Sequence, residues 1–511
     1  MNILLAYTSG AADRSDPYLN LLPSGLCYLH AVLSEAGFNP QLANFSAWRR
    51  QTVKRHLMAL RPDLIGISQW THNRFESLEL ARLARQANPA CVVVMGGGHA
   101  SFSYEEQLQS GVVDLVVIGE GETTLREIVE RYANGQELTG IPGTVYRVVE
   151  QVMTAAPRPP IENLDTLPQP SRYLDHNTVG IDSRLQAEFV LTARGCPYTC
   201  HFCSSPAFWG RRVRFRSPGN IVDEMFYIRD HYGLIYFSLR DDTFTADRKR
   251  AAEFCRILID RKAGLLWNCQ SNVNSLNEEL LILMKRAGCE CVQLGVESGS
   301  PRILKQLGKG VDPERVVAVA EMIRRVGMNL SIYLISDIPG ESEEDISHTR
   351  ALIRKLRPDD GYVSPLAYYP GTRLYRDAVD AGQTTSGLFE DTAGPALYAQ
   401  PGGTASRRLM KVFASLPAPA PDRFEKCKSL LGFCHTTNIL AGEWFESAGR
   451  QDLALKEYQE IISAEPSNPW GWFLAGECLE ESDQAAARNC FRKVVELVPN
   501  HGPALEKLAK K

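Results

Sequence analysis

The sequence predicts an α/β protein made of a doubly wound parallel sheet, an incomplete (β/α)6 barrel and a C-terminal α-helical repeat region. Three observations in the 511 residues support this class. Short apolar runs alternate with amphipathic stretches in the first third, the alternation resumes after residue 186, and similar helical segments recur near the end. We therefore expect domains over residues 1–150, 186–385 and 426–511, with a linker over 151–185 and a linker or extension over 386–425.

Four apolar runs supply the strands of the predicted parallel sheet. They have the length and β-branched content of strands buried on both faces, and they span residues 3–7, 64–68, 92–95 and 115–118. Stretches of helical spacing, over residues 25–36, 75–88 and 123–133, separate them. Ligands of such a sheet bind beyond the carboxyl ends of its strands, so we expect the binding residues in the loops there. These loops contain Thr8, Ser68, Trp70, Gly97, Gly98, His99, Gly119 and Glu120.

Six further strand candidates predict the barrel. They span residues 189–193, 235–239, 266–270, 291–295, 330–335 and 361–369, with helical stretches such as 251–262, 277–287, 313–326 and 343–356 between them. Five prolines between Pro157 and Pro170 oppose a helix or a central strand, which is why residues 151–185 are interpreted as a linker. Chemistry in such barrels gathers at the carboxyl ends of the strands, so we expect the active site there.

Three cysteines follow the first barrel strand with the spacing C-x3-C-x2-C, at Cys196, Cys200 and Cys203. Three thiolates this close can hold three corners of a four-iron cluster and leave the fourth iron open. A closed zinc site requires four ligands and usually a second cysteine or histidine pair, which does not follow in the sequence. A zinc site that borrows a distant ligand, or three ordinary thiols, is the alternative. The remaining cysteines lie mostly in apolar runs, as buried thiols do.

The cysteine motif resembles that of the radical S-adenosylmethionine superfamily. The resemblance implies that the open iron of a [4Fe–4S] cluster chelates S-adenosylmethionine, and that an electron from the cluster cleaves it to a 5′-deoxyadenosyl radical that abstracts hydrogen from unactivated carbon. It also implies a set of residues that bind S-adenosylmethionine at the strand ends, namely Phe202, Asp241, Asp242, Glu297, Ser336 and Ile338. The alternative for the two aspartates is that they cap the next helix.

Two positions depart from the pattern of that superfamily. Asp337 stands where glycine is usual in the turn after the fifth barrel strand. Asn272 stands where arginine is common after the third strand, so a carboxylate-binding role is not carried over to it.

Residues 96–101, Gly-Gly-Gly-His-Ala-Ser, and residues 114–122 together resemble the cobalamin-binding domain that precedes many radical S-adenosylmethionine enzymes. The resemblance covers about residues 1–150 and implies that the loop residues named above bind cobalamin. No histidine lies between Tyr7 and Tyr28, so the Asp-x-His-x-x-Gly signature of a histidine ligand below cobalt is absent. We expect cobalamin without that lower ligand; the alternative is a domain that has lost cobalamin.

The C-terminal region contains a repeat. Residues 454–466 recur as residues 487–499, a displacement that resembles the period of tetratricopeptide helix pairs. Two repeats are fewer than such arrays usually need, so we expect this region to dock on the barrel or on a protein partner. A helical cap with chance similarity is the alternative.

Composition limits the remaining classes. A net charge of -4 argues against a nucleic-acid partner, and the apolar runs are all too short for a membrane span. The N-terminus has no basic region or cleavage site, and unpaired thiols suit a reducing compartment, so we expect a cytoplasmic protein.

The leading hypothesis is a cobalamin-dependent radical enzyme that methylates an unactivated carbon of a small molecule or peptide. Its expected partners are that substrate and an electron donor such as flavodoxin or ferredoxin. The first alternative is a radical cyclase or rearrangement enzyme without methyl transfer. The second is an interaction protein with a vestigial barrel, against which the intact cysteine motif argues.

Overall fold

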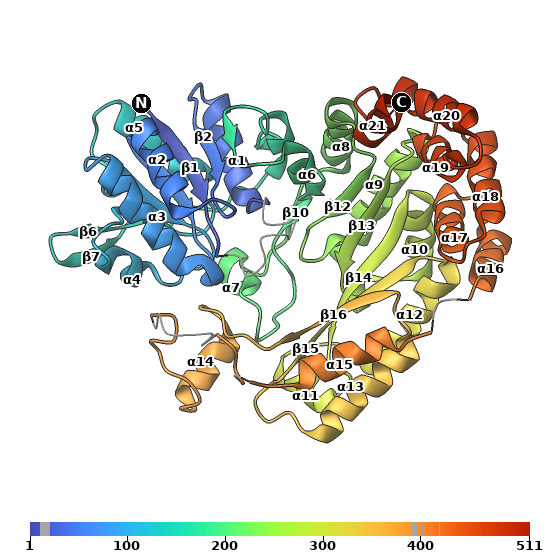
Figure 1. Ribbon diagram of the computed structural model, residues 1–511. Coiled ribbons are helices and arrows are strands. Elements are labelled where there is room, and N and C mark those ends of the chain that lie inside the picture. Colours follow the sequence, from blue (N-terminus) through green and yellow to red (C-terminus); the bar gives the residue numbers. More distant parts are fainter. Residues whose placement is uncertain (11–20, 391–396, 401, 418–419, 511) are drawn as a thin grey trace. The chain divides into compact units, whose positions relative to one another are not determined.

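The computed structural model describes residues 1–10, 21–390, 397–400, 402–417 and 420–510. It divides into two compact units, coloured along the chain in Figure 1. The first comprises Met1–Ala187, Phe202–Arg214 and Tyr368–Leu397, and the second comprises Glu188–His201, Phe215–Ala367 and Tyr398–Lys511. Within the described ranges, every helix falls short of the apolar length that crossing a bilayer requires.

The first unit contains an eight-stranded sheet in the order β7-β6-β5-β4-β3-β1-β2-β8. Its parallel strands are β1 (Ile3–Tyr7), β2 (Gln41–Asn44), β3 (Leu64–Ser68), β4 (Val92–Gly96), β5 (Leu115–Val117) and β8 (Thr178–Val179). The antiparallel strands β6 (Thr144–Val148) and β7 (Gln151–Thr154) extend one edge. The chain reverses its direction of strand addition between β1 and β3, and ligands bind at such a switch point.

Helices cover the sheet because its apolar side chains need burial on both faces. All five residues of β1 and of β3 are buried, as expected for central parallel strands. The helices α1 (Ser24–Glu35) and α5 (Glu122–Ala133) contact each other, and α2 (Arg50–Leu60) contacts α3 (Arg74–Ala87). The short helix α4 (Tyr104–Gln109) contacts β5.

The segment predicted as a linker contributes to this sheet at both edges. β7 pairs with β6, and β8 pairs with β2 through Leu42 and Thr178. The prolines lie between these two strands, where they interrupt no ladder. The short helix α6 (Ser183–Ala187) follows β8.

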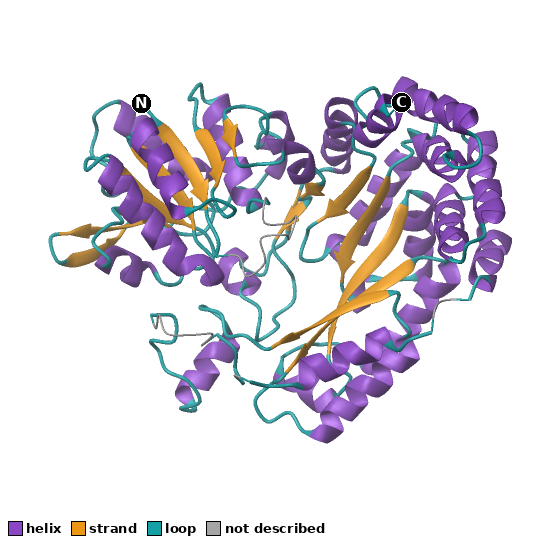
Figure 2. Ribbon diagram, viewed as in Figure 1, coloured by secondary structure: helices purple, strands orange, loops and turns teal. Residues whose placement is uncertain are grey.

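The second unit contains the predicted six parallel strands, in the order β16-β15-β14-β13-β12-β9. They are β9 (Phe189–Val190), β12 (Tyr236–Leu239), β13 (Leu266–Ser271), β14 (Cys289–Glu297), β15 (Asn329–Ser336) and β16 (Asp360–Pro365). The helices between them are α8 (Pro218–Tyr232), α9 (Arg248–Asp260), α10 (Glu278–Arg286), α11 (Pro301–Gln306), α12 (Pro313–Val326) and α13 (Glu343–Leu356). Figure 2 shows the curved sheet with its helices on one side, as in an incomplete barrel.

Shorter elements lie in the loops. The strands β10 (Ala193–Arg194) and β11 (Arg214–Phe215) flank the cysteine segment in the sequence, and α7 (Ser205–Trp209) follows its last cysteine. The helix α14 (Arg373–Asp380) follows β16, and α15 (Ala405–Ala414) comes later and contacts β16.

The C-terminal helices pack in sequence order, each against the next. They are α16 (Asp422–Leu431), α17 (His435–Ser447), α18 (Gln451–Ala464), α19 (Pro469–Leu479), α20 (Gln484–Leu497) and α21 (Gly502–Ala509). They dock on the barrel: Leu266 of β13 shares a core with Ile439 and Tyr458, and the Thr436 hydroxyl donates to the carbonyl of Lys285, 3.0 Å away. Docking on the barrel is therefore observed, whereas tetratricopeptide identity stays a prediction.

Candidate functional site

The three motif cysteines differ from most others in their exposure. Cys196, Cys200 and Cys203 are partly exposed, whereas most of the remaining cysteines are buried. Burial raises the pKa of Cys27 and of Cys91 to about 12, so these thiols stay protonated and unreactive. The motif cysteines are thus accessible to a metal group in a way that the core cysteines are not.

The cysteine segment is attached to the barrel through Asp241, whose side chain is fully buried. Its carboxylate accepts the N–H groups of Thr192 (2.6 Å) and Ala193 (2.9 Å) and the Thr192 hydroxyl. Arg250 donates to the carbonyl and the hydroxyl oxygen of Thr192, at 2.7 and 2.6 Å. Burial raises the pKa of Asp241, and Arg250 opposes the rise. Asp241 therefore fixes the backbone that leads into the cysteines, whereas its neighbour Asp242 is exposed.

Glu297 ends β14 and forms a buried ion pair. The Nζ atom of Lys309 lies 2.9 Å from its Oε1, and the two side chains are only 9% and 10% exposed. Glu297 adopts a positive φ of 68°, and a Cβ on Gly295 would lie 2.7 Å from its Oε1. Burial raises the pKa of the Cys200 thiol, the nearby Lys309 lowers it, and Glu297 raises it. The pair therefore belongs to the surroundings of the cysteine loop.

The loop after α11 holds the cysteine segment at His201. The His201 N–H donates to the carbonyl of Leu307 (2.8 Å), and its Nδ1 lies 3.0 Å from the carbonyl of Gln306. Gly308 has a φ of +63°, and a Cβ there would lie 2.5 Å from the His201 ring. Glycine is thus required at this close approach, directly before Lys309.

The turn after β15 contains Ser336 and Ile338, which are both buried. The Glu341 carboxylate accepts the N–H groups of Asp337 (2.8 Å) and Ile338 (3.4 Å) and so closes the turn. Burial raises the pKa of Glu341 to about 7. The side chains of Ser336 and Ile338 are enclosed by protein, so a role in binding would fall to their backbone.

The side chain of Asp337 forms structural hydrogen bonds, which explains why aspartate stands where the superfamily usually has glycine. Its Oδ1 and Oδ2 atoms accept the N–H groups of Ala405 (2.9 Å) and Ser406 (3.0 Å), which open α15. The residue has a φ of 54°, which aspartate tolerates better than most residues with a side chain. A carboxylate at a helix N-terminus also suits the helix dipole.

In the first unit, the predicted cobalamin residues follow the carboxyl ends of β1, β3, β4 and β5. Trp70 is 42% exposed, and a Cβ on Gly98 would lie 3.1 Å from its ring. Gly97 has a φ of +102°, and a Cβ there would lie 2.7 Å from the carbonyl of Gln69. The two glycines thus leave the backbone without side chains at the carboxyl end of β4, beside the exposed indole of Trp70. This arrangement admits a broad, flat ligand.

Two of the predicted residues lie away from this surface. His99 is fully buried, with its Nδ1 3.2 Å from the Thr71 hydroxyl and its ring edge-on to Phe389. Burial lowers its pKa to about 3, so the imidazole is neutral. The Glu120 carboxylate accepts from Arg214 at 2.8 Å and from the N–H of Ile161 at 2.7 Å. These contacts give both residues structural tasks, and their binding roles stay predictions.

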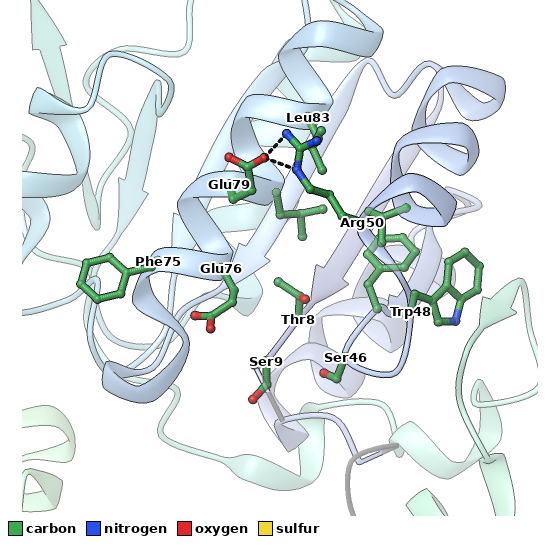
Figure 3. A pocket seen from close by; sticks show the side chains of 13 residues that line it. Thr8, Ser9, Ser46, Trp48, Arg50, Phe75, Glu76, Glu79 and Leu83 are labelled. Carbon is green, nitrogen blue, oxygen red and sulfur yellow. Dashed lines mark hydrogen bonds and ion pairs between the residues drawn. The ribbon is translucent and has the colours of Figure 1, made fainter. Parts of the chain in front are cut away.

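A pocket of about 460 Å³ opens beside the ends of β1 and β2, against α2 and α3 (Figure 3). Thr8 and Ser9 lie at one side of it, and Phe45 and Trp48 pack edge to face at another. The Arg50 guanidinium pairs with Glu79 across the pocket at 2.6 Å. Of the predicted cobalamin residues, only Thr8 lines this pocket.

Family models match two parts of the chain. The radical SAM superfamily model matches residues 190–353, and the B12 binding domain model matches residues 15–129. An uncharacterised methyltransferase of Pyrococcus horikoshii is 34% identical over 365 residues, which make up 70% of this chain and 78% of that protein. The chain belongs to the cobalamin-dependent radical SAM enzymes.

Other relatives of this radical SAM enzyme carry different activities in their names. The anaerobic magnesium-protoporphyrin IX monomethyl ester cyclase of Rubrivivax gelatinosus is 28% identical over 385 residues, 73% of this chain and 69% of that protein. The solved radical S-adenosylmethionine methyltransferase TsrM of Kitasatospora setae has the same fold, with a TM-score of 0.67 and 19% identity over 88% of this chain and 99% of that one.

The donor set of the radical SAM enzyme fits its iron–sulfur cofactor. Among the described residues, no three His, Cys, Asp or Glu side chains gather around a point where one metal ion would bind. A zinc site requires such a group, whereas in a [4Fe–4S] cluster each cysteine ligates a different iron. The radical SAM and B12 binding domain matches give the cofactors as a [4Fe–4S] cluster, S-adenosylmethionine and cobalamin.

Sequence reasoning missed Lys309. A lysine in a loop usually indicates a solvated charge, and its burial depends on a contact with Glu297, twelve residues earlier. The flanking Gly308 and Gly310 were the available signal, because paired glycines indicate a close backbone approach.

Proposed function

We propose that the enzyme transfers the methyl group of S-adenosylmethionine to an unactivated carbon of its substrate. The observation that supports this most is the 34% identity, over 70% of the chain, to a protein named as a methyltransferase. The absence of a histidine between Tyr7 and Tyr28 agrees with it, because cobalamin without a lower histidine ligand favours transfer of methyl as a radical. Bound cobalamin supplies the methyl carrier, and the cluster supplies the electron that cleaves S-adenosylmethionine.

The protein positions the cofactors and excludes water from them. Cys196, Cys200 and Cys203 would hold the cluster, and Asp241 would fix the backbone before them through Thr192. Glu297, held by Lys309, would accept hydrogen bonds from the ribose or the ammonium group of S-adenosylmethionine.

The remaining binding roles follow the predicted sets. Phe202, Asp242 and the backbone of Ser336 and Ile338 would complete the nucleoside site. Thr8, Ser68, Trp70, Gly97, Gly98 and Gly119 would line the cobalamin site, with His99 and Glu120 supporting its loops.

The partners and the cellular location are also proposals. The cluster would take electrons from a flavodoxin or ferredoxin, and the helices from α16 to α21 would offer a surface to a peptide or protein partner. We place the enzyme in the cytoplasm, in agreement with its thirteen free cysteines.

A cyclase is the second candidate function, favoured by the Rubrivivax gelatinosus relative. S-adenosylmethionine with a trideuterated methyl group separates the two candidates. The enzyme, reconstituted anaerobically and reduced, is incubated with small-molecule extracts of the source cells, and products are followed by mass spectrometry. Methyl transfer predicts a product that carries the trideuteriomethyl group together with 5′-deoxyadenosine. A product without the label, formed together with 5′-deoxyadenosine, would favour the cyclase and contradict the proposal.

A further inference from the structure

The two faces of the barrel sheet differ in chemistry. Side chains alternate along each strand, and one set packs against the helices, as Trp267 does against Phe254 of α9. The other set, which faces the barrel interior, is mostly polar or aromatic. Its apolar members are Leu266 of β13 and Ile335 of β15, and Leu266 and Tyr236 pack against the C-terminal helices. Its other members include Tyr236 and Ser238 of β12, Asn268 and Gln270 of β13, Cys291 and Gln293 of β14, Ser331 and Tyr333 of β15, and Tyr362 and Ser364 of β16.

Hydrogen bonds between strands confirm that this set shares one face. The Tyr333 hydroxyl donates to Oε1 of Gln293 (3.2 Å), and the Ser238 hydroxyl donates to Oδ1 of Asn268 (2.9 Å). Asn268 in turn donates to the Tyr236 hydroxyl at 2.6 Å. Ser238 and Asn268 are already buried by these contacts, whereas Gln270, Gln293 and Tyr333 are partly exposed. An apolar substrate seated over these three side chains would remove their water without replacing its hydrogen bonds, which is costly. The interior is thus built for a substrate that forms hydrogen bonds.

Arg240 adds a positive charge at the carboxyl end of β12. It continues the alternation of Tyr236 and Ser238, so it lies on the interior side, and its guanidinium lies over the Phe189 ring at 4.7 Å. The side chain is exposed, and its guanidinium has no hydrogen-bond or ion-pair partner in the described parts of the chain. Its charge also reaches Tyr333 and Glu188, where it lowers pKa values that burial raises.

The opposite edge of the same face carries a negative charge. Asp360 of β16 is exposed and pairs in register with Ser331 of β15. The same row across the sheet continues through Gln293 of β14 to Gln270 of β13. Leu239 pairs in register with Cys269, so the residues that follow them, Arg240 and Gln270, lie next to each other in the same row. An anionic group would be attracted to the Arg240 end of this row and repelled from the Asp360 end. The row therefore defines the orientation of an anionic substrate, with its negative group at Arg240.

We propose that the substrate is a polar molecule with an anionic oxygen group, a carboxylate or phosphate, that Arg240 binds. Its body lies along Gln270 and Gln293, beside Tyr333 and Tyr362, which pair in register and are partly exposed. This inference rests on the proposed function and narrows its substrate class. It excludes an apolar lipid, because the partly exposed side chains of Gln270, Gln293 and Tyr333 would lose their hydration to such a surface.

The test uses the reconstituted, cobalamin-loaded enzyme and measures 5′-deoxyadenosine formation. Extract of the source cells is divided into an anion-exchange-retained aqueous fraction, an unretained aqueous fraction and an organic-solvent fraction. We expect the retained fraction to stimulate the reaction. In Arg240→Gln, half-maximal stimulation should need about ten- to a hundredfold more of that fraction, the range for losing a charged hydrogen bond. Lys249→Gln, which removes an exposed charge from α9, should need no more than the unsubstituted enzyme.

Each other outcome overturns the inference. Stimulation by the organic or the unretained fraction, stimulation by none, or an equal response of Arg240→Gln and Lys249→Gln would contradict it. The cluster signal in electron paramagnetic resonance, recorded on the same samples, distinguishes this failure from failure of the proposed function. Stimulation without label transfer from trideuterated S-adenosylmethionine would reject methyl transfer and leave the substrate class intact.

Discussion

Lys309 Nζ lies 2.9 Å from Glu297 Oε1, and protein encloses both side chains almost completely. A buried charge without its partner is strongly destabilising, so removal of either side chain alone should cost more than removal of both. The pair also places one positive and one negative charge in the vicinity of Cys200, with opposite effects on the pKa of its thiol.

We expect Lys309→Met to lower the free energy of unfolding by about 3 kcal/mol and to weaken S-adenosylmethionine binding. The Glu297→Gln/Lys309→Met double variant should recover part of the stability but not the binding. Urea unfolding and equilibrium dialysis measure the two effects. Lys305→Met, at an exposed position of α11, is the control. Additive losses in the double variant would show that the two residues do not interact.

Asp241 and Asp242 are adjacent in sequence and should differ in effect. In Asp241→Asn the amide oxygen can still accept the N–H groups of Thr192 and Ala193, which both bond to Oδ1. The amide NH2 group then replaces the oxygen that accepts the Thr192 hydroxyl, and the charge that interacts with Arg250 is lost, which should displace the segment before the cysteines. The iron content after reconstitution should fall several-fold, whereas Asp242→Asn should keep its iron. Equal iron content in the two variants would remove the structural role from Asp241.

Asp337 should matter for α15 rather than for cofactor binding. In Asp337→Ala the N–H groups of Ala405 and Ser406 lose their acceptors, at a cost of about 1 kcal/mol. Hydrogen exchange of these amides should accelerate, whereas Asp337→Asn, which keeps one acceptor oxygen, should lie between Asp337→Ala and the unsubstituted protein. Unchanged protection in Asp337→Ala would mean that another contact holds the helix start.

Glu341 should make stability depend on pH. Its pKa is raised from 4.5 to about 7 in the folded protein, so the folded state favours the protonated form. The stabilisation is complete below pH 4.5 and is lost as the pH rises through about 7. Glu341→Gln should remove this dependence and stabilise the protein at pH 8 by about 1 kcal/mol, after allowance for solvent screening. Thermal unfolding between pH 5 and 8 measures it, with exposed Glu344→Gln as the control; parallel curves for the two variants would contradict the assignment.

The sequence was sufficient to predict the elements that depend on local pattern. The apolar runs over 3–7 and 64–68 became the buried strands β1 and β3, and all six barrel strands were found. The strand β2 was missed because its four residues, Gln-Leu-Ala-Asn, show neither a long apolar run nor clear alternation. The edge strands β7 and β8 were missed because the prolines between them dominate the composition of that segment.

Long-range contacts could not be predicted in the same way. Asp337 caps a helix that begins 68 residues later, and Asp241 binds a backbone 49 residues earlier. His99 has no local signal for its burial, which depends on Phe389. Such residues look like site residues in the sequence because charge and loop position are visible there, whereas their tertiary partners are not.

The most direct test of the central claim is iron and cobalt analysis, together with electron paramagnetic resonance, on enzyme reconstituted anaerobically with iron, sulfide and cobalamin. A cobalamin-dependent radical enzyme should bind one [4Fe–4S] cluster and one cobalt per chain. The cobalt signal should lack histidine nitrogen coupling, and Cys200→Ala should lose the cluster signal but keep the cobalt. A folded protein that binds neither group, or a Cys200→Ala variant with an unchanged cluster signal, would contradict the account.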